Sequence, residues 1–319
     1  MKALITGAGG FVAPYLRKAV SDDLNCEITF TGRAGGKHDK GNHEFREADI
    51  LDPAALLSLL QDEHPHYIFH LAAQSSVARS WKDPAETVNV NIKGALCLLD
   101  AVRALDYSPR VIMVGSGEEY GHIKPDDVPI KEGQFLRPGN IYAATKAGQN
   151  MMAYVYAKAY DMDVIMTRSF NHMGPGQKPV FVASDFCRQA VRIEKGFQDN
   201  VIRVGNLEAK RDFTDVRDVV KAYTALAQFG IPGETYNVGR GEPTAIKDLL
   251  SMITDLSTAD IKVEVDEKKL RPIDIPEIYP DVSKIYAATG WKAHIPVKQT
   301  LLDMLEYYRN NPEILSDEG

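Results

Sequence analysis

The sequence contains few cysteines and no long apolar run. The 319 residues include three cysteines, Cys26, Cys97 and Cys187, which are too few and too far apart for a disulfide framework or a zinc site. The sequence lacks an uninterrupted apolar stretch of about 18 residues and therefore predicts no membrane span. It also opens without the layout of a signal peptide. We therefore expect a cytoplasmic protein with reduced thiols and no membrane partner.

The chain also lacks an excess of positive charge. Its formal net charge is -7, whereas binding to the nucleic-acid backbone requires a basic face, so we expect no nucleic-acid partner. The three histidines His64, His66 and His70 have no accompanying cysteine or carboxylate spacing, and we predict no metal site. Hydrophobic residues make up 44% and charged residues 25%, which is typical of globular proteins. At about 150 residues per domain, this length indicates roughly two domains.

The first half of the chain alternates short apolar runs with helical patterns. Strict alternation of this kind implies parallel strands joined by right-handed crossovers. The predicted strands are 2–5, 27–31, 44–47, 67–70, 111–114 and 163–167, and the predicted helices are 11–21, 53–62, 84–105 and 141–160. We therefore predict an α/β fold, a doubly wound parallel Rossmann sheet whose ligand crevice lies at the carboxyl ends of the strands.

After Thr167 the regular alternation ends in a loop rich in glycine and proline, 171–179. Helical patterns follow at 181–195, 216–229, 245–256 and 297–311, a strand at 235–238 and a charged loop at 267–280. We predict a smaller α/β carboxyl-terminal substrate domain. The predicted division assigns 1–167 and about 212–240 to the nucleotide domain, and 168–211 and 241–319 to the substrate domain.

A glycine-rich turn follows the first predicted strand. Gly7, Gly10 and Ala13 fit the pattern Gly-x-x-Gly-x-x-Ala. Gly7 permits the tight turn, Gly10 lets the backbone approach a pyrophosphate, and Ala13 permits close packing of the helix on the strand. The free N–H groups of the following helix would face the anion. The turn therefore predicts a dinucleotide-binding site.

The end of the second predicted strand bears on the choice of cofactor. An acidic residue at this place suits the ribose 2′-hydroxyl of NAD, whereas arginine accommodates a 2′-phosphate. The sequence has Thr31-Gly32-Arg33 there, which favours NADP(H), with NAD(H) as the alternative if Arg33 is only a solvated loop residue. Asp49 and Ile50, after the third strand, are expected to flank the adenine.

Ser116, Tyr142 and Lys146 form a candidate catalytic set. Tyr142 and Lys146 are one helical turn apart and share a helix face, and Ser116 lies just past a predicted strand. A nearby ammonium group lowers the pKa of a phenol, which is normally near 10. Tyr142 would then exchange a proton with a carbonyl or alcohol oxygen that Ser116 also contacts.

These residues carry a resemblance to a known family. The turn 7–13, the run 70–73 (His-Leu-Ala-Ala), Asn91, Ser116 and the pair Tyr142 and Lys146 resemble the extended short-chain dehydrogenase/reductase family. Four narrower stretches, 115–121, 170–177, 204–218 and 270–272, resemble its GDP-sugar branch. Within that branch the chain is most similar to reductases of GDP-4-keto-6-deoxy-D-mannose, which form GDP-D-rhamnose. Their sisters, the GDP-mannose 4,6-dehydratases, share most of these stretches.

The resemblance implies roles for individual residues and an assembly. It implies a GDP-linked hexose as substrate and a homodimer in which helices 84–105 and 141–160 pair as a four-helix bundle. The implied cofactor-binding residues are Gly7, Gly10, Phe11, Val12, Arg33, Asp49, Ile50, Leu71, Ala72, Ala73, Asn91, Tyr142 and Lys146. The implied substrate-binding residues are Ser75, Glu118, Asn171, Asn206, Arg211 and Arg271.

Reductase and dehydratase are distinguished by the residues after Ser116. A 4,6-dehydratase needs an additional base, and often an acid, beside its serine or threonine. Gly117 cannot donate a proton, but Glu118 matches the dehydratase glutamate and is counted with the catalytic residues. The doubled glutamate before Tyr120 is more similar to the reductases, so we favour NADPH-dependent reduction of the C4 ketone. The alternatives are the dehydratase, a nucleotide-sugar 4-epimerase and a non-catalytic NADPH sensor.

Overall fold

A seven-stranded parallel sheet forms the centre of the larger lobe. The computed structural model describes residues 1–33, 44–266 and 276–315. The strand order is β11-β6-β5-β4-β1-β2-β3, and every neighbouring pair is parallel. The strands are β1 (Lys2–Thr6), β2 (Glu27–Gly32), β3 (Glu44–Glu47), β4 (Tyr67–His70), β5 (Arg110–Ser116), β6 (Val164–Ser169) and β11 (Thr235–Val238). This order reverses direction between β1 and β4 and confirms the predicted doubly wound fold.

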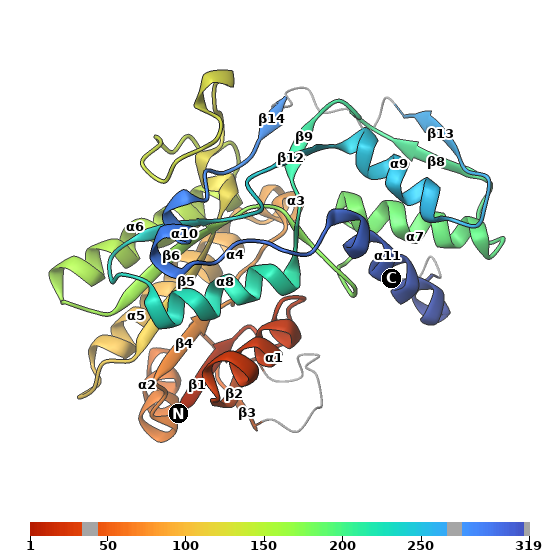
Figure 1. The fold of residues 1–319 in the computed structure, drawn as a ribbon. Coiled ribbons are helices and arrows are strands. Elements are labelled where there is room, and N and C mark those ends of the chain that lie inside the picture. Colours follow the sequence, from red (N-terminus) through yellow and green to blue (C-terminus); the bar gives the residue numbers. More distant parts are fainter. Residues whose placement is uncertain (34–43, 267–275, 316–319) are drawn as a thin grey trace.

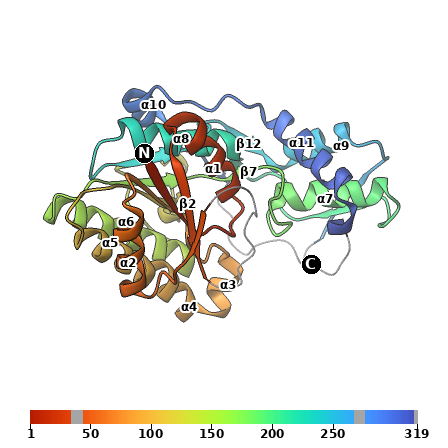
Figure 2. The same cartoon turned by 90° about the horizontal axis from the view of Figure 1, so that it is seen from below.

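Consecutive side chains of each central strand enter two separate cores. Leu4 and Ile68 pack with α2 (Pro53–Glu63), α5 (Gly94–Arg103) and α6 (Ile141–Ala159). Their neighbours Ile5 and Phe69 pack with α1 (Ala13–Leu24), α8 (Val216–Phe229) and α10 (Ser283–Thr289). Because strand side chains alternate between faces, an apolar run covered by helices on both sides produces this arrangement. Figure 2 shows the sheet between the two helix layers.

The smaller lobe has its own core. Its helices are α7 (Val182–Glu194), α9 (Ile246–Leu256) and α11 (Val297–Asn310), which bury Phe186, Leu249 and Leu301 together. Short strands complete the lobe and its junction with the sheet: β7 (His172–Met173) pairs with β10 (Thr214–Asp215), β8 (Val201–Val204) with β13 (Lys262–Val265), and β9 (Lys210–Asp212) with β12 (Pro243–Ala245) and β14 (Glu277–Ile278). Figure 1 shows this lobe beside the carboxyl ends of the sheet.

The carboxyl-terminal part of the chain contributes to both cores. Ile285 and Trp291 are buried in the core of the larger lobe, although the predicted division places them in the substrate domain. Helix α10 packs on α8 and β11 because its apolar residues cover the end of that core. The predicted return of 216–238 to the sheet is realised by α8 and β11, and the full division of the chain into domains stays a prediction.

The single helix predicted over 84–105 is wrong in detail. The structure divides it into α4 (Pro84–Val88), a π-helical turn (Asn89–Lys93) and α5. The extra residue of the π turn accompanies a fully buried amide at Asn91, and π turns are common at functional sites. A further short helix, α3 (Val77–Lys82), was not predicted; the Ser76 hydroxyl caps it by accepting a hydrogen bond from the Arg79 amide.

Candidate active site

The glycine-rich turn after β1 lies against the segment that follows β4. Gly7 has a φ of +80°, and a Cβ there would lie 2.8 Å from the Ala72 amide nitrogen. The Gly10 amide donates to the Gly7 carbonyl at 2.9 Å, and a Cβ at Gly10 would lie 3.2 Å from that oxygen. Ala13 is completely buried. All three positions therefore meet the geometric requirements that the motif predicted.

The first turn of α1 can hold an anion. Among the described residues no side chain caps its amino terminus at Val12. The Ala13 amide donates to the Gly10 carbonyl at 3.3 Å and Pro14 has no N–H, so the amides of Phe11 and Val12 are the ones placed to meet a phosphate. Phe11 and Val12 are half-buried, and Gly9 and Gly10 are exposed. The bare turn, the uncapped helix and the close approach of Ala72 fit the diphosphate of a dinucleotide.

The residues predicted for the adenosine end lie at the carboxyl ends of β2 and β3. Arg33 is exposed directly after β2, and the hydroxyl of the buried Thr31 has no hydrogen-bond partner among the described residues. Asp49 is exposed, and its carboxylate accepts a hydrogen bond from the Leu51 amide at 2.9 Å. Ile50 is buried, and a Cβ on Gly94 would lie 2.6 Å from its Cδ1. Asp49 is thus placed at the surface and Ile50 in the wall behind it.

Ser116 and Tyr142 meet at the carboxyl end of β5. Ser116 is the last residue of the strand rather than part of the following loop, and its register partner on β6 is Ser169. Its side chain lies close enough to the Tyr142 phenol to lower the pKa of that group. Burial raises the pKa of Tyr142 to about 12, the Ser116 hydrogen bond lowers it, and Glu118 and Glu119 raise it. The phenol therefore carries its proton at neutral pH.

Lys146 lies one turn further along α6 and is buried. Its Nζ donates to the Val114 carbonyl at 2.7 Å and to Gln149 Oε1 at 2.9 Å. Burial lowers the pKa of this amine to about 8, and Glu119 opposes the decrease. The sequence led us to expect that lysine lowers the pKa of the phenol, but in this structure the net shift of Tyr142 is upward. Burial outweighs the stabilisation of a phenolate while the amine is held by Val114 and Gln149.

Glu118 joins the turn after β5 to the start of α6. Its amide donates to Ser116 Oγ at 3.2 Å, and its carboxylate accepts a hydrogen bond from Asn140, the N-cap of α6, at 3.2 Å. The preceding residue, Gly117, faces an aromatic ring, because a Cβ there would lie 3.0 to 3.2 Å from ring atoms of Phe170. The site therefore holds one exposed carboxylate near Tyr142, and the ring restricts the room for a side chain at position 117.

Asn91 connects the segment after β4 to the catalytic helix. Its Oδ1 accepts from the Gln74 amide at 2.8 Å, and its Nδ2 donates to the Gln74 carbonyl at 3.1 Å and to Thr145 Oγ1 at 2.9 Å. The side chain is fully buried. These bonds hold the Asn91 amide on both sides, and the predicted contact of Asn91 with the cofactor stays a prediction. Asn91 positions Ala72 and Ala73, which precede Gln74, relative to Tyr142 and Lys146.

His70 is a buried residue that the sequence did not single out for catalysis. Its Nδ1 is 3.0 Å from Thr6 Oγ1, which in turn accepts a hydrogen bond from the Ala72 amide at 3.1 Å. Burial lowers the pKa of His70 to about 3, and the Lys146 charge lowers it further. His70 is therefore a neutral group that ties β1 to the segment following β4.

The residues predicted for substrate binding are spread over both lobes. Ser75 follows the β4 segment and Asn171 follows β6; both are exposed at the carboxyl edge of the sheet. Asn206 lies between β8 and β9, where its side chain accepts a hydrogen bond from the Glu208 amide at 3.0 Å. Arg211 is on β9 and donates to the Lys210 carbonyl at 2.8 Å. Arg271 lies outside the described residues.

Sequence reasoning missed a buried polar cluster next to the turn Gly117–Tyr120, which follows β5. Glu119 is fully buried and paired with Arg168 of β6 at 2.9 Å, and Asn150 of α6 donates to both of its carboxylate oxygens. No local motif links these three positions. The one available signal in the sequence was the second glutamate of the pair Glu118-Glu119, and only the structure shows that this second side chain is buried.

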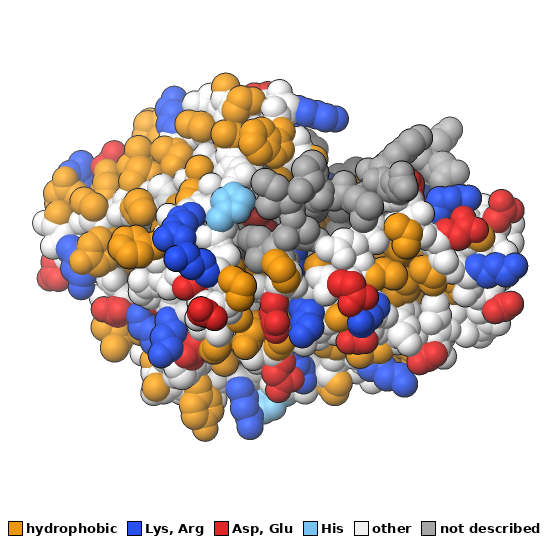
Figure 3. Space-filling model, turned by 90° about the horizontal axis from the view of Figure 1, so that it is seen from above, with side chains coloured by type: hydrophobic (Ala, Val, Ile, Leu, Met, Phe, Trp, Pro, Cys, Tyr) orange, Lys and Arg blue, Asp and Glu red, His pale blue; other side chains and the backbone are white. Residues whose placement is uncertain are grey.

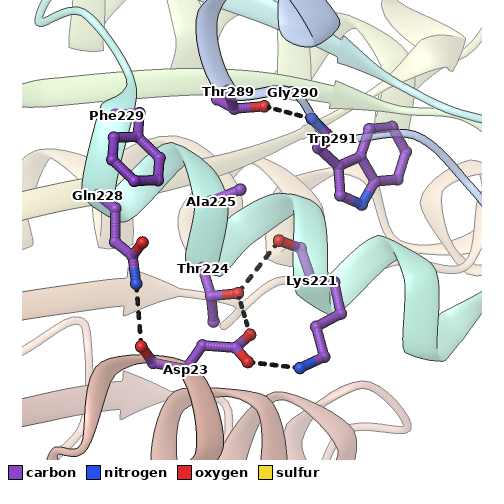
Figure 4. A pocket seen from close by; sticks show the side chains of 9 residues that line it. All are labelled: Asp23, Lys221, Thr224, Ala225, Gln228, Phe229, Thr289, Gly290 and Trp291. Atoms are coloured by element: carbon purple, nitrogen blue, oxygen red, sulfur yellow. Dashed lines mark hydrogen bonds and ion pairs between the residues drawn. The ribbon is translucent and has the colours of Figure 1, made fainter.

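A separate hollow lies at the opposite edge of the sheet. It measures about 390 Å³ and is lined by residues of α1, α8 and the end of α10, as Figure 4 shows. The last turn of α1 lies near the amino ends of the strands, so this hollow is remote from Ser116. Its polar groups are paired with one another: Asp23 accepts from Lys221 and Thr224, and its carbonyl accepts from Gln228 at 2.9 Å. We therefore place the candidate active site at the carboxyl edge of the sheet and not in this hollow.

Two further properties concern the described residues as a whole. None of the described helices is long and apolar enough to cross a membrane. Within the same residues there is no group of three or more His, Cys, Asp or Glu side chains arranged to hold a metal ion.

Comparisons with known proteins agree with this geometry. The chain is 34% identical to GDP-6-deoxy-D-mannose reductase of Pseudomonas aeruginosa over 81% of this chain and 84% of the relative. It is 28% identical to GDP-mannose 4,6-dehydratase of Sinorhizobium fredii over 95% of each chain. The structure of RMD from Pseudomonas aeruginosa complexed with NADPH superposes with a TM-score of 0.84 at 30% identity, covering 98% of this chain and 100% of that one. The family model for GDP-mannose 4,6 dehydratase matches residues 4–304, and the chain belongs to this family.

Proposed function

We propose that this protein reduces the C4 ketone of GDP-4-keto-6-deoxy-D-mannose with NADPH and forms GDP-D-rhamnose. One observation carries the proposal: Tyr142, a half-buried phenol that keeps its proton at neutral pH, lies near Ser116 at the carboxyl edge of a parallel sheet that begins with a glycine-rich turn. Ketone reduction consumes a proton at the carbonyl oxygen, and a phenol that is protonated at neutral pH can supply it because the alkoxide formed by hydride addition is the stronger base. The relative in Pseudomonas aeruginosa is named GDP-6-deoxy-D-mannose reductase, which supports the same reaction.

The roles of the three catalytic residues follow from their placement. Ser116 donates a hydrogen bond to the ketone oxygen and stabilises the negative charge that develops there. Tyr142 transfers its proton to that oxygen. Lys146, charged over part of the neutral range because its pKa is about 8, favours the phenolate left on Tyr142. NADPH, when bound, supplies the hydride that reaches the carbonyl carbon.

The residues of the larger lobe hold the cofactor in this proposal. Gly7, Gly10 and the amides at Phe11 and Val12 would hold the diphosphate, and Leu71 and Ala72, which lie against Gly7, would complete this part of the cofactor site together with Ala73. Arg33 binds the 2′-phosphate, Asp49 and Ile50 flank the adenine, and Lys146 holds the nicotinamide ribose. NADPH is present in the related RMD structure, and an epimerase of Thermus thermophilus, 25% identical, was solved with NAD; NADPH is therefore the proposed cofactor and NADH the alternative.

The substrate is proposed to bind between the lobes. Ser75, Glu118 and Asn171 contact the sugar at the carboxyl edge, and Asn206 and Arg211 of the smaller lobe contact the nucleotide, together with Arg271. Arginine suits the diphosphate because its planar guanidinium matches phosphate oxygens in pairs. Such local positive charge permits an acidic protein to bind a doubly charged ligand.

The second candidate is the dehydratase reaction that gives the family model its name. Glu118 favours it, because this carboxylate lies near Tyr142 and its only described side-chain contact is the amide of Asn140. Elimination also requires protonation of the leaving C6 hydroxyl. Position 117, which follows the catalytic serine, has no side chain, and the Phe170 ring lies where a Cβ would point. The GDP-sugar dehydratases that the chain resembles also lack an acid at this position, so the preference for reduction rests on the higher identity to the named reductase, 34% against 28% for the dehydratase.

Two incubations separate the two reactions. With GDP-4-keto-6-deoxy-D-mannose, the protein is expected to oxidise NADPH, and Tyr142→Phe is expected to lower the rate by about 10² to 10⁴ because the proton donor is lost. Conversion of GDP-mannose to a 4-keto sugar without added NADPH would instead identify a dehydratase. Binding of NADPH without consumption would identify a sensor, and inversion at C4 of an intact hexose an epimerase.

We also propose a homodimer and a cytoplasmic location. Three apolar residues of α6, Met151, Tyr154 and Val155, are at least half exposed and lie on one face of the helix at spacings of three and four residues. Trp81 and Val88 of the adjoining α3 and α4 are exposed as well. Figure 3 shows apolar side chains gathered over the left of the molecule, the side where Figure 1 places α5 and α6. A second copy packed on this face would form a four-helix bundle.

A further inference from the structure

The carboxylate of Glu119 is bonded to three elements of the catalytic lobe. Oε1 accepts from the Ser116 amide at 2.8 Å and from Asn150 Nδ2 at 2.8 Å. Oε2 accepts from Arg168 Nε at 2.9 Å and from Asn150 Nδ2 at 3.1 Å. In every one of these contacts the partner group donates the hydrogen bond and the carboxylate accepts it. Burial raises the pKa of Glu119 above its ordinary value, and Arg168 and the donated hydrogen bonds oppose this shift only in part. The contacts themselves, all donors and one of them a guanidinium, favour the carboxylate.

The surroundings leave this carboxylate no freedom to move. A Cβ on Gly115 would lie 2.4 Å from Glu119 Oε1 and 2.2 Å from the Thr167 carbonyl, so the strand must carry glycine beside it. Arg168 is held on its other side by the Tyr120 hydroxyl at 3.1 Å and the Glu132 carbonyl at 2.9 Å. The bond from Glu119 to the Ser116 amide therefore fixes the backbone from which the Ser116 hydroxyl projects.

Glu119 also acts on the charge of the site. It is the one group whose charge opposes the lowering of the Lys146 pKa by burial, and its charge raises the pKa of Tyr142. Both effects keep protons on the two groups that act in ketone reduction. A neutral residue at position 119 would release both groups from this influence.

The titratable groups that face this cluster come from six segments. They are His70 of β4, Glu118 and Tyr120 of the turn after β5, the half-buried Glu132 of the loop before α6, Tyr142 and Lys146 of α6, Arg168 of β6 and Tyr223 of α8. Of these, His70 is neutral above its pKa of about 3 and Tyr223 is held protonated by burial. Glu119 is therefore the buried negative charge among them, and Glu118 the exposed one.

We propose that Glu119 is a positioning residue of the active site, which orients Ser116 through its main-chain amide and retains the positive charge of Lys146. The kinetic consequences of this role rest on the proposed reductase function, whereas its effect on the protonation of Lys146 does not. Arg168 and Asn150 hold the carboxylate in place. Glu119 itself touches neither substrate nor cofactor in this role.

The test compares two carboxylates that each pair with an arginine. Glu194, the last residue of α7, has a side chain 6% exposed and accepts two hydrogen bonds from Arg309 at 2.7 and 2.9 Å, but it belongs to the smaller lobe. The variants are Glu119→Gln and, as the control, Glu194→Gln. Both are expected to unfold at a lower temperature, because each removes the negative charge from its ion pair.

Only Glu119→Gln is expected to change the pKa of Lys146. In protein labelled at the lysine side chains, with the Lys146 signal assigned through Lys146→Arg, its NMR titration midpoint is expected near pH 8 in the unaltered chain. It should move to lower pH in Glu119→Gln and stay in place in Glu194→Gln. An unchanged midpoint in Glu119→Gln, or an equal change in Glu194→Gln, overturns the charge role whether or not the protein reduces the keto sugar.

A second variant tests the orientation of Ser116 if Glu119→Gln does not fold. Glu119→Asp keeps the charge but withdraws the carboxylate by one methylene from the Ser116 amide. We expect kcat for NADPH oxidation with the keto sugar to fall about tenfold with KM unchanged, since a stabilising donor is misplaced only toward the transition state. A wild-type kcat in this variant overturns the positioning role, whereas absence of turnover in the unaltered chain overturns the proposed function.

Discussion

At the scale of single residues, backbone geometry decides what position 7 can hold. Gly7 combines a φ of +80° with a Cβ position 2.8 Å from the Ala72 amide nitrogen. An alanine there would strain the backbone and separate the two segments that we propose to hold the cofactor diphosphate. The glycine pattern in the sequence predicted a tight turn at this residue, but not that its neighbour would be the segment after β4.

Gly7→Ala is therefore expected to weaken NADPH binding more than tenfold, because displacement of the turn removes several main-chain donors from the diphosphate. A fluorescence titration with NADPH measures the loss. Gly133→Ala is the control, since a Cβ at Gly133 meets no atom within 4 Å. Equal affinities for Gly7→Ala and the control would contradict this reading of the turn.

Other residues of the site show where prediction from sequence ends. Tyr142 and Lys146 could be paired in advance because helical periodicity puts residues four apart on one face. Glu119 could not, because its partners Asn150 and Arg168 are 31 and 49 residues away. Their meeting depends on the register of β5 with β6 and on how α6 lies across both strands, which no local pattern encodes.

At the scale of elements, the π-helical turn is the main departure from the predicted helices. The apolar pattern over 84–105 is continuous, so periodicity indicated one helix. The buried amide of Asn91 bonds both main-chain groups of Gln74 and the Thr145 hydroxyl. The turn thereby joins the segment after β4 to the catalytic helix, a tertiary requirement that overrides local propensity.

Asn91→Asp is expected to lower the free energy of unfolding by roughly 2–4 kcal/mol, because two donated hydrogen bonds disappear and a carboxylate is buried in their place. Urea denaturation measures this difference. Asn89→Asp, at an exposed position of the same turn, is expected to change stability by less than about 0.5 kcal/mol. Similar losses in both variants would show that the turn itself, and not the buried amide, is sensitive.

At the scale of the whole molecule, one buried histidine links stability to pH. The pKa of His70 is lowered from 6.5 to about 3 by burial. The unfolded chain therefore binds a proton between these values that the folded chain does not, and stability is lost as the pH falls through this window. Asp212 acts oppositely, since burial raises its pKa to about 6 and favours the folded state as the pH falls.

His70→Asn isolates the contribution of the histidine, because Asp212 is present in both proteins. The asparagine side chain retains a partner for Thr6 Oγ1 and does not titrate. Between pH 7 and pH 4.5 we expect the unaltered chain to lose about 2 kcal/mol more stability than the variant. Equal losses in urea titrations at the two pH values would show that His70 is accessible to protons in the folded state.

The assembly is also a property of the whole molecule. If the exposed face of α6 forms the proposed dimer, the double variant Met151→Glu and Val155→Glu places two charges in an apolar interface and should yield monomers. Light scattering coupled to gel filtration measures the mass. Lys298→Glu, exposed on α11 of the smaller lobe, serves as the charge control. Dimers that persist in the double variant would exclude this face as the interface.

The central claim is reduction at C4, and isotope transfer tests it most directly. NADPH carrying deuterium at the transferable position is incubated with GDP-4-keto-6-deoxy-D-mannose, and the product is analysed by mass spectrometry and NMR. We predict a GDP-6-deoxyhexose with one deuterium at C4, formed by the unaltered chain and nearly absent with Tyr142→Phe. A product without deuterium at C4, or turnover of GDP-mannose to a 4-keto sugar in the absence of added NADPH, would contradict the claim.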